Sequence, residues 1–154
     1  MGAKVKNPRK KFLWSIAFPK HPINNYLFQT CTLPDVEIDQ VAHGDVNRDV
    51  KTAGRVTVGN LVVGKLLTTA GSDTWLHDWL YSCQDMIAGG GLVPSQYWEN
   101  VIVNELAEDG VSVLNTHLFE EVWPCKITGL DLDRMASENT IESIEFSVGT
   151  VDKY

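Results

Sequence analysis

Carboxylates recur at every second position in the stretch "LPDVEID". On an extended chain Asp35, Glu37 and Asp39 point to one side, while the apolar residues between them point to the other. A second acidic pair, Asp131 and Asp133, alternates in the same way in "GLDLDRM". Paired carboxylates can act as the general acid and base of a hydrolase, or a row of them can form a solvated sheet face. Like charges side by side are costly on a sheet, yet the residues alone favour a plain solvated face.

Other catalytic or metal-binding patterns are missing from the sequence. The four histidines, at positions 21, 43, 77 and 117, have no metal-type spacing to one another or to a cysteine. The run "GGGLVPS" lacks the lysine and hydroxyl residue of a phosphate-binding loop, and no GxSxG, HExxH or GxGxxG motif occurs. We therefore expect no metal, no cofactor and no enzymatic activity.

The three cysteines, Cys31, Cys83 and Cys125, are far apart and form no CxxC motif. An odd number of widely spaced cysteines is typical of a reducing cytosol, where thiols stay free. Pairing between chains stays open as an alternative for a protein that later leaves the cytosol in a particle.

The charge of the chain is unevenly distributed. The 154 residues are the usual size of one domain, and 44% of them are hydrophobic. Residues 1–11 carry +5, so the remainder carries −12, because the whole chain carries −7. An acidic body repels the phosphate backbone, which argues against a conventional nucleic-acid binder. We expect a flexible basic N-terminal arm over 1–11 and a single domain over 12–154. We expect no secretory leader and no membrane segment.

Most of the chain has the pattern of β-strands. Strands are expected in "FLWSIAF", in "YLFQTCTLPDVEIDQV" with a break at Pro34, in "VTVGNLVVGKLL", and in "WENVIVNEL" and "VSVLNTHLFEEVWP". "CKITGLDLDRM" and "NTIESIEFSVGTV" also alternate, and in the latter Ile144, Phe146 and Val148 share a face. The fold class is therefore mainly β, a sandwich or barrel of about seven strands flanked by one α-helix.

That helix is expected over residues ~73–88, in "SDTWLHDWLYSCQDMIA". Ser72 or Asp73 can cap its start, and three glycines at 89–91 can end it. The five tryptophans of the chain are better explained by packing than by a ligand cage. Apolar residues recur at helical spacing on the face expected to pack on the sheet, namely Trp75, Leu76, Trp79, Leu80 and Cys83, followed by Met86 and Ile87.

A long polar stretch, "AHGDVNRDVKTAGR" over residues 42–55, shows neither helical nor strand periodicity. We expect a long loop here, and loops of this length in compact domains are usually functional. A floppy surface loop and a contact loop are both compatible with its composition. Its charged or titratable residues are His43, Asp45, Arg48, Asp49, Lys51 and Arg55.

The order of these segments resembles the tail-tube proteins of contractile-tailed bacteriophages, a group that includes the tube of type VI secretion. The resemblance is carried by "LFQTCTLPDVEID", by "GKLLTTAGSDTWLHDWLYSC", and by "FEEVWPCKITGLDLDRMASENTIESIEFSV". It covers nearly the whole chain beyond the basic arm. The sequence departs from the family pattern in having "LP" where the family usually has "GL" after its second strand.

The resemblance implies hexameric rings that stack into a hollow tube inside a contractile sheath and conduct the genome. Implied partners are other copies of the chain, the sheath, the baseplate, the tail terminator and the tape-measure protein. DNA would pass without specific binding. The implied location is the virion, with assembly in the cytoplasm of the host bacterium. On this basis Asp35, Glu37, Asp39, Asp131 and Asp133 are candidates for lining the lumen, and the charged residues of 42–55 for meeting the next ring.

Three further interpretations stay open at this point. A tube subunit of a secretion or tailocin-like contractile device would have much the same sequence. A monomeric ligand-binding β-barrel would use its tryptophans around an apolar cavity, and a hydrolase would depend on a carboxylate pair.

Overall fold

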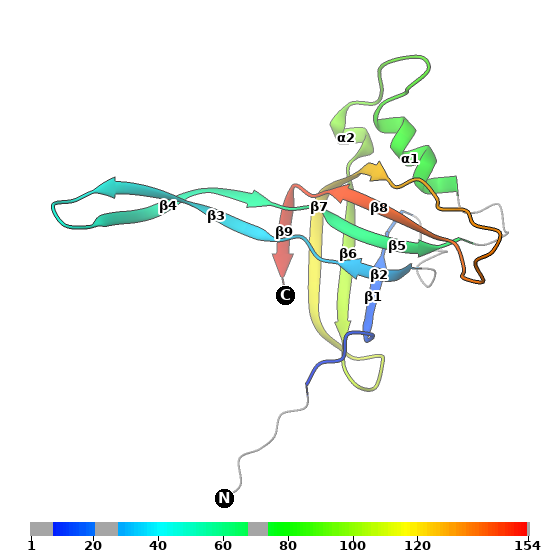
Figure 1. Cartoon of the computed structure of the whole chain (residues 1–154), viewed down its shortest axis with the longest axis horizontal. Coiled ribbons are helices and arrows are strands. Elements are labelled where there is room, and N and C mark those ends of the chain that lie inside the picture. The colour runs from blue at the N-terminus through cyan, green and yellow to red at the C-terminus, as the bar shows by residue number, and fades with distance from the viewer. Residues whose placement is uncertain (1–7, 21–27, 68–73, 154) are drawn as a thin grey trace, which may run out of the picture.

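The computed structural model describes residues 8–20, 28–67 and 74–153, and Figure 1 shows that strands dominate them. The strands are β1 (Trp14–Ala17), β2 (Phe28–Thr32), β3 (Val36–Gly44), β4 (Asp49–Val58), β5 (Leu61–Leu66), β6 (Glu99–Leu106), β7 (Val113–Ile127), β8 (Ile141–Ser147) and β9 (Thr150–Lys153). The helices are α1 (Trp75–Cys83) and α2 (Pro94–Tyr97). The mainly β prediction is confirmed.

Seven strands form one antiparallel sheet in the order β1-β6-β7-β8-β5-β2, with β9 also paired to β7. Strands β3 and β4 form a separate two-stranded hairpin. Because β1 and β2 are the two ends of the strand order, the described strands do not close into a barrel. Of the expected sandwich or barrel, the closed barrel is not found among the described strands, which form an open sheet with a projecting hairpin.

Strand β7 joins the two halves of this sheet. Its first part pairs with β6 and β9, and from Trp123 onward it pairs with β8. Between the two parts Glu121 has a φ of 57°, a left-handed conformation that is uncommon outside glycine. Such a residue breaks the regular pleat, so one long strand can turn from one half of the sheet into the other.

One hydrophobic cluster lies between the two halves of the sheet and α1. Ile16, Val101 and Phe119 come from one half, and Leu61 and Phe146 from the other; all are at most 2% exposed. Burying apolar area of this kind stabilises the fold by roughly 25 cal/mol per Å². Ile144 and Phe146 in β8 and Val148 just after it are buried, as the alternation in the sequence predicted.

Helix α1 covers the core with its aromatic face. Leu76 and Trp79 are buried, and the rings of Phe18, Trp75 and Trp79 pack together, with centroids 5.3 to 6.5 Å apart. The helix is shorter than expected, since it ends at Cys83 rather than near 88. Met86 and Ile87 are 76% and 96% exposed on the loop that follows, so their assignment to the packing face was wrong. The expected caps Ser72 and Asp73 lie outside the described residues.

The long loop expected over 42–55 is wrong. These residues form most of the β3–β4 hairpin, which projects from the body at the left of Figure 1, with a turn at 45–48. Backbone pairing runs from Val36↔Val58 to Gly44↔Asp49. Hydrophobic periodicity could not reveal these strands because β3 is exposed along its whole length, and so is β4 up to its last residue.

The strand expected in "CKITGLDLDRM" is also wrong beyond its first residues. Strand β7 ends at Ile127, and Asp131 and Asp133 lie in the irregular segment 128–140. The alternating pattern is not backed by burial here, since Leu130 and Leu132 are 42% and 77% exposed. Among the described residues no helix is long and apolar enough to cross a membrane.

Candidate assembly surfaces

The β3–β4 hairpin is the most exposed element of the chain. At about 3.3 Å per residue its strands reach roughly 30 Å from the body. The ribbon is closed by a turn in which Asp45 N donates to Arg48 O at 2.8 Å. At its base, Gly59 N donates to Asp35 O at 2.7 Å and ties the ends of β3 and β4 together.

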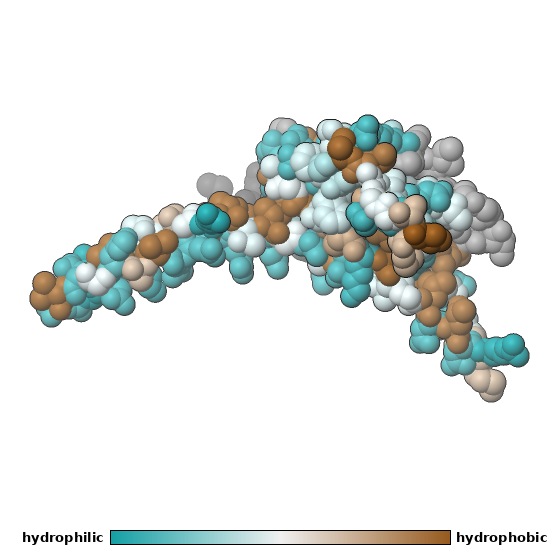
Figure 2. Space-filling view, turned by 90° about the horizontal axis from the view of Figure 1, so that it is seen from above, coloured by the Kyte–Doolittle hydropathy of each residue, from teal (hydrophilic) through white to brown (hydrophobic). Residues whose placement is uncertain are grey.

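One side of the hairpin near its base is apolar. Val36 pairs with Val58, and Ile38 pairs with Val56, so these side chains lie on one face. Val36, Ile38 and Val56 are 54%, 57% and 60% exposed, respectively. A two-stranded ribbon with an uncovered apolar face is marginal in water by itself, and such a face marks a contact surface. We call Val36, Ile38 and Val56 the hairpin stripe. Figure 2 shows apolar surface along the projecting hairpin, at the left of the view.

The structure agrees only in part with the predicted row of three carboxylates on one strand face, Asp35, Glu37 and Asp39. Glu37 and Asp39 lie in β3 on the side opposite the hairpin stripe, whereas Asp35 precedes the strand. A register shift between Ile38 and Gln40 leaves Asp39 outside the regular pairing. All three carboxylates are exposed. The structure therefore gives two carboxylates on one strand face and a third at the hairpin base.

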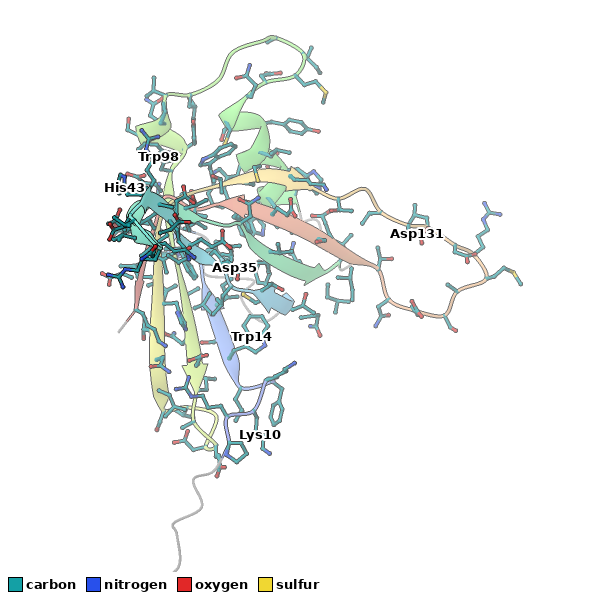
Figure 3. All side chains as sticks on the ribbon, turned by 60° about the vertical axis from the view of Figure 1, so that its left-hand side comes forward. Lys10, Trp14, Asp35, His43, Trp98 and Asp131 are labelled. Carbon is teal, nitrogen blue, oxygen red and sulfur yellow. The ribbon has the colours of Figure 1, made fainter. Side chains whose placement is uncertain are left out.

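The charged residues expected in a loop are distributed along the hairpin instead. His43 and Lys51 belong to β3 and β4, as do Asp49 and Arg55, and all are exposed. Asp45 and Arg48 form the turn at the tip. All six charged or titratable residues therefore lie on the β3–β4 hairpin, which projects from the body (Figure 1). Figure 3 shows His43 on this hairpin and Asp131 on a separate segment far from it, so the two acidic groups are not brought together.

Asp131 and Asp133 sit on the exposed segment 128–140, which curves around a shallow hollow also lined by Arg134 and Glu138. Asp133 Oδ1 accepts a hydrogen bond from the backbone N of Met135 at 2.9 Å. The local structure accounts for Asp133 as a turn residue.

The described end of the N-terminal arm is held by a polar network. Arg9 Nη1 and Asn115 Nδ2 each donate to Glu105 Oε2 at 2.8 Å, and His117 Nε2 lies 3.7 Å from the same oxygen. Partial burial opposes ionisation of Glu105, but the Asn115 bond and the Arg9 charge together hold the pKa of its carboxyl below the usual value. Arg9 thus fixes where the arm leaves the domain.

Helix α1 carries the predicted packing residues, and it also contributes to a buried polar cluster that the sequence did not reveal. Leu76 and Trp79 are buried, and the other three residues of the set are half-buried. On the neighbouring face His77 Nε2 lies 3.1 Å from Glu142 Oε2. Glu142 is 3% exposed, and its cross-strand neighbour Lys65 is completely buried. The apolar periodicity of β8 conceals this polar cluster, because Glu142 shares the buried face with Ile144.

The cysteines are free thiols. Burial raises the pKa of the Cys31 thiol from 9.0 to about 11. Burial also raises the pKa values of Cys83 and Cys125, although Cys125 is exposed enough to be reached from solvent. Within the described residues no group of three metal-capable side chains lies together.

Open sheet edges, an exposed hairpin and an unusually accessible apolar stripe are features of a protein built to assemble with others. Residues 10–151 match the family described as T4-like virus tail tube protein gp19, and the chain belongs to this family. It is a structural tail tube protein of contractile systems and not an enzyme. No curated protein sequence is significantly similar to the chain.

Solved structures share this fold. A chain in the cryo-EM structure of the anti-feeding prophage cap, the tube-terminating cap, superposes with a TM-score of 0.81 at 15% identity, covering 100% of this chain and 95% of the other. The sheath/tube terminator of the PVC extracellular contractile injection system gives 0.79 at 16% identity, covering 97% and 99%. Hcp1 from Flavobacterium johnsoniae gives 0.52 at 14% identity, covering 92% and 94%. At these identities the similarity shows the fold alone.

Proposed function

We propose that this chain assembles into hexameric rings that stack into the hollow inner tube of a phage tail, through which DNA passes. The observation that carries the proposal is the hairpin stripe, because Val36, Ile38 and Val56 are more than half exposed on a projecting two-stranded ribbon. A second copy supplies the missing apolar partner. Strands β1 and β2 are the two ends of the described strand order, and their edges offer backbone groups for strand pairing between copies.

The solved structures support a tube with accessory partners. They include a sheath–tube complex and a sixfold-symmetrised baseplate. We propose the same classes of partner for this chain, namely a contractile sheath, a baseplate, a terminator and a tape-measure protein. The particle forms in the bacterial cytoplasm and the chain resides in the tail of the virion.

Within this proposal the polar side of the hairpin and its base face the channel. Glu37 and Asp39 lie opposite the hairpin stripe, so covering the stripe leaves their carboxylates exposed, with Asp35 beside them. Carboxylates repel phosphates, so DNA meets no point along the bore where it would bind. Asp131 and Asp133 are proposed for the same surface, and the charged residues at 43–55 for contacts with the next ring.

A graded charge series tests the channel assignment. The variant Asp35→Lys/Glu37→Lys/Asp39→Lys should form tubes but deliver DNA poorly, because lysines retain phosphates. The neutral variant Asp35→Asn/Glu37→Gln/Asp39→Asn serves as the matched control and should give intermediate delivery. Tubes are counted by negative-stain electron microscopy and delivery by infectivity per particle. Normal delivery by the lysine variant, or failure of both variants to form tubes, would contradict the assignment.

A tube of a secretion or tailocin-like device is the second candidate, favoured by the origin of the solved structures in injection systems and type VI secretion. The two candidates differ in cargo. Particles purified with intact tubes carry DNA in a phage and none in the other devices, so a nuclease-protection assay separates them. The ligand-binding barrel has less support, because Trp75 and Trp79 pack with Phe18 rather than around an apolar cavity.

A further inference from the structure

Helices α1 and α2 enclose a groove that the assembly surfaces described above do not use. Its volume is about 280 Å³. Trp79 Nε1 donates to Tyr97 O at 2.8 Å and holds the two helices together at its floor. The residues that line it combine aromatic rings with two carboxylates, namely Trp75, Asp78, Trp79, Ser82, Gln96, Tyr97 and Glu99.

This composition fits a positively charged side chain. A cation gains from an aromatic face and from a carboxylate at once, and both are offered here. Lysines of the same chain already make both kinds of contact with residues of the groove. Lys65 Nζ lies 5.9 Å from the centre of the Trp75 ring, and Lys20 Nζ lies 3.9 Å from Glu99 Oε1. Asp78 is exposed on the outer turn of α1. The groove therefore has a carboxylate facing solvent beside aromatic rings.

The chain itself carries the complementary segment. Residues 66–125, which contain the groove, hold nine Asp and Glu and no Lys or Arg. Residues 1–11 hold five Lys and Arg and no Asp or Glu. In Figure 3 Lys10, at the root of the arm, and Trp98, directly after α2, lie at opposite ends of the body. The described root of the arm therefore lies at the end of the body opposite the groove of the same copy.

We propose that the basic arm of one copy binds the α1–α2 groove of another copy, with Lys4 and Lys6 as the side chains that enter. This inference rests on the proposed self-assembly and names a specific contact within it. Arg9 fixes the root of the arm on Glu105. The seven residues before Pro8 span at most about 25 Å, enough to reach a neighbouring subunit. Lysines two residues apart on an extended segment point to the same side, so both can approach the exposed carboxylate of Asp78, whereas Glu99 already pairs with Lys20.

A contact of this kind is heterologous, because the arm of each copy uses a surface that differs from the arm itself. Repeated head to tail, it links copies into a ring where the rotation between subunits closes, or into a continuing stack where it does not, rather than into a two-fold pair. It is also sensitive to salt, since the carboxylate of Asp78 is exposed and screening weakens exposed charge pairs.

Peptide binding tests the contact without requiring tubes. A fluorescent peptide with the sequence of residues 2–12 is titrated into the full chain, at concentrations where the protein is monomeric, and anisotropy is measured in 20 and 150 mM salt. We expect saturable binding that weakens with salt. Asp78→Lys should lower the affinity at least tenfold. Glu108→Lys, an equal charge change at another exposed site, should lower it less than threefold.

A charge exchange makes the test specific. A peptide with Lys4→Glu and Lys6→Glu should not bind the natural chain but should bind the Asp78→Lys variant. Equal binding of a peptide of scrambled sequence would overturn the arm as the specific occupant and indicate a groove for basic segments in general. Equal losses from Asp78→Lys and Glu108→Lys, or no binding in low salt, would also overturn the proposal.

These experiments distinguish failure of the arm contact from failure of the proposed tube function. If the natural chain forms no rings but binds the peptide, the tube proposal fails and the arm contact stands. If tubes form normally with Asp78→Lys and the peptide does not bind, the arm contact fails and the tube proposal stands.

Discussion

The hairpin stripe gives the sharpest prediction about assembly. Replacing Val36, Ile38 and Val56 together by threonine keeps the β-branched shape that suits a strand and makes the stripe polar. Full burial of such an apolar side chain is worth about 1.5–3 kcal/mol, and slightly more than half of each remains exposed in the single chain. Covering the stripe in an assembly therefore contributes roughly 2.5–5 kcal/mol, and its loss should weaken association by about 60- to 4,000-fold.

The assay is the critical concentration for assembly, measured by light scattering and sedimentation at fixed salt. The free energy of unfolding of the monomer should change by less than about 0.5 kcal/mol per site, because exposed positions contribute little to it. Val111→Thr, at a position 80% exposed on the β6–β7 turn, is the matched control and should leave assembly unchanged. An unchanged critical concentration for the triple variant would refute the reasoning, since the stripe would then be solvated in the assembly as well.

Three predictions concern the body of the domain. His77→Ala removes the hydrogen bond to the buried Glu142 carboxylate, so the free energy of unfolding in urea should fall by about 1–3 kcal/mol; no change would mean that water replaces the imidazole. Gly91→Ala places a Cβ against a backbone carbonyl at the end of α1 and should lower thermal stability by about 1–3 kcal/mol, whereas Gly129→Ala, with open space around it, should be neutral. Because the thiol of Cys31 has a pKa raised to about 11, its alkylation rate should keep rising between pH 9 and 11, and the stability that its protonated form contributes should decline over the same range; a rate that levels off at pH 9 would contradict the assigned burial.

The sequence predicted elements well where burial and alternation agree. In β8 and directly after it, apolar residues at 144, 146 and 148 reach the core from one face, so a period of two was visible. In α1, Leu76 and Trp79 are buried with helical spacing, and the element was correctly placed even though its end was not. Both cases depend on side chains that must leave water, which is the property that hydrophobic periodicity records.

The hairpin and the segment 128–140 show the opposite case. Strands β3 and β4 are held by backbone pairing and are almost entirely exposed, so their side chains carry no core pattern. Leu130 and Leu132 imitate a strand but are exposed. The acidic row was recognised from spacing alone, but the bulge next to Asp39 and the early position of Asp35 depend on backbone geometry that spacing does not encode.

The order of strands in the sheet has a consequence for the folding kinetics of the subunit. The β3–β4 and β6–β7 hairpins pair residues close in sequence, and such hairpins form in about 1–10 μs. The pairs that complete the body are distant, as Leu61 with Phe146 and Trp14 with Glu105 show. Loop closure over such separations makes folding slow. The projecting hairpin therefore forms and reopens many times before the body closes, because by itself it is marginally stable in water.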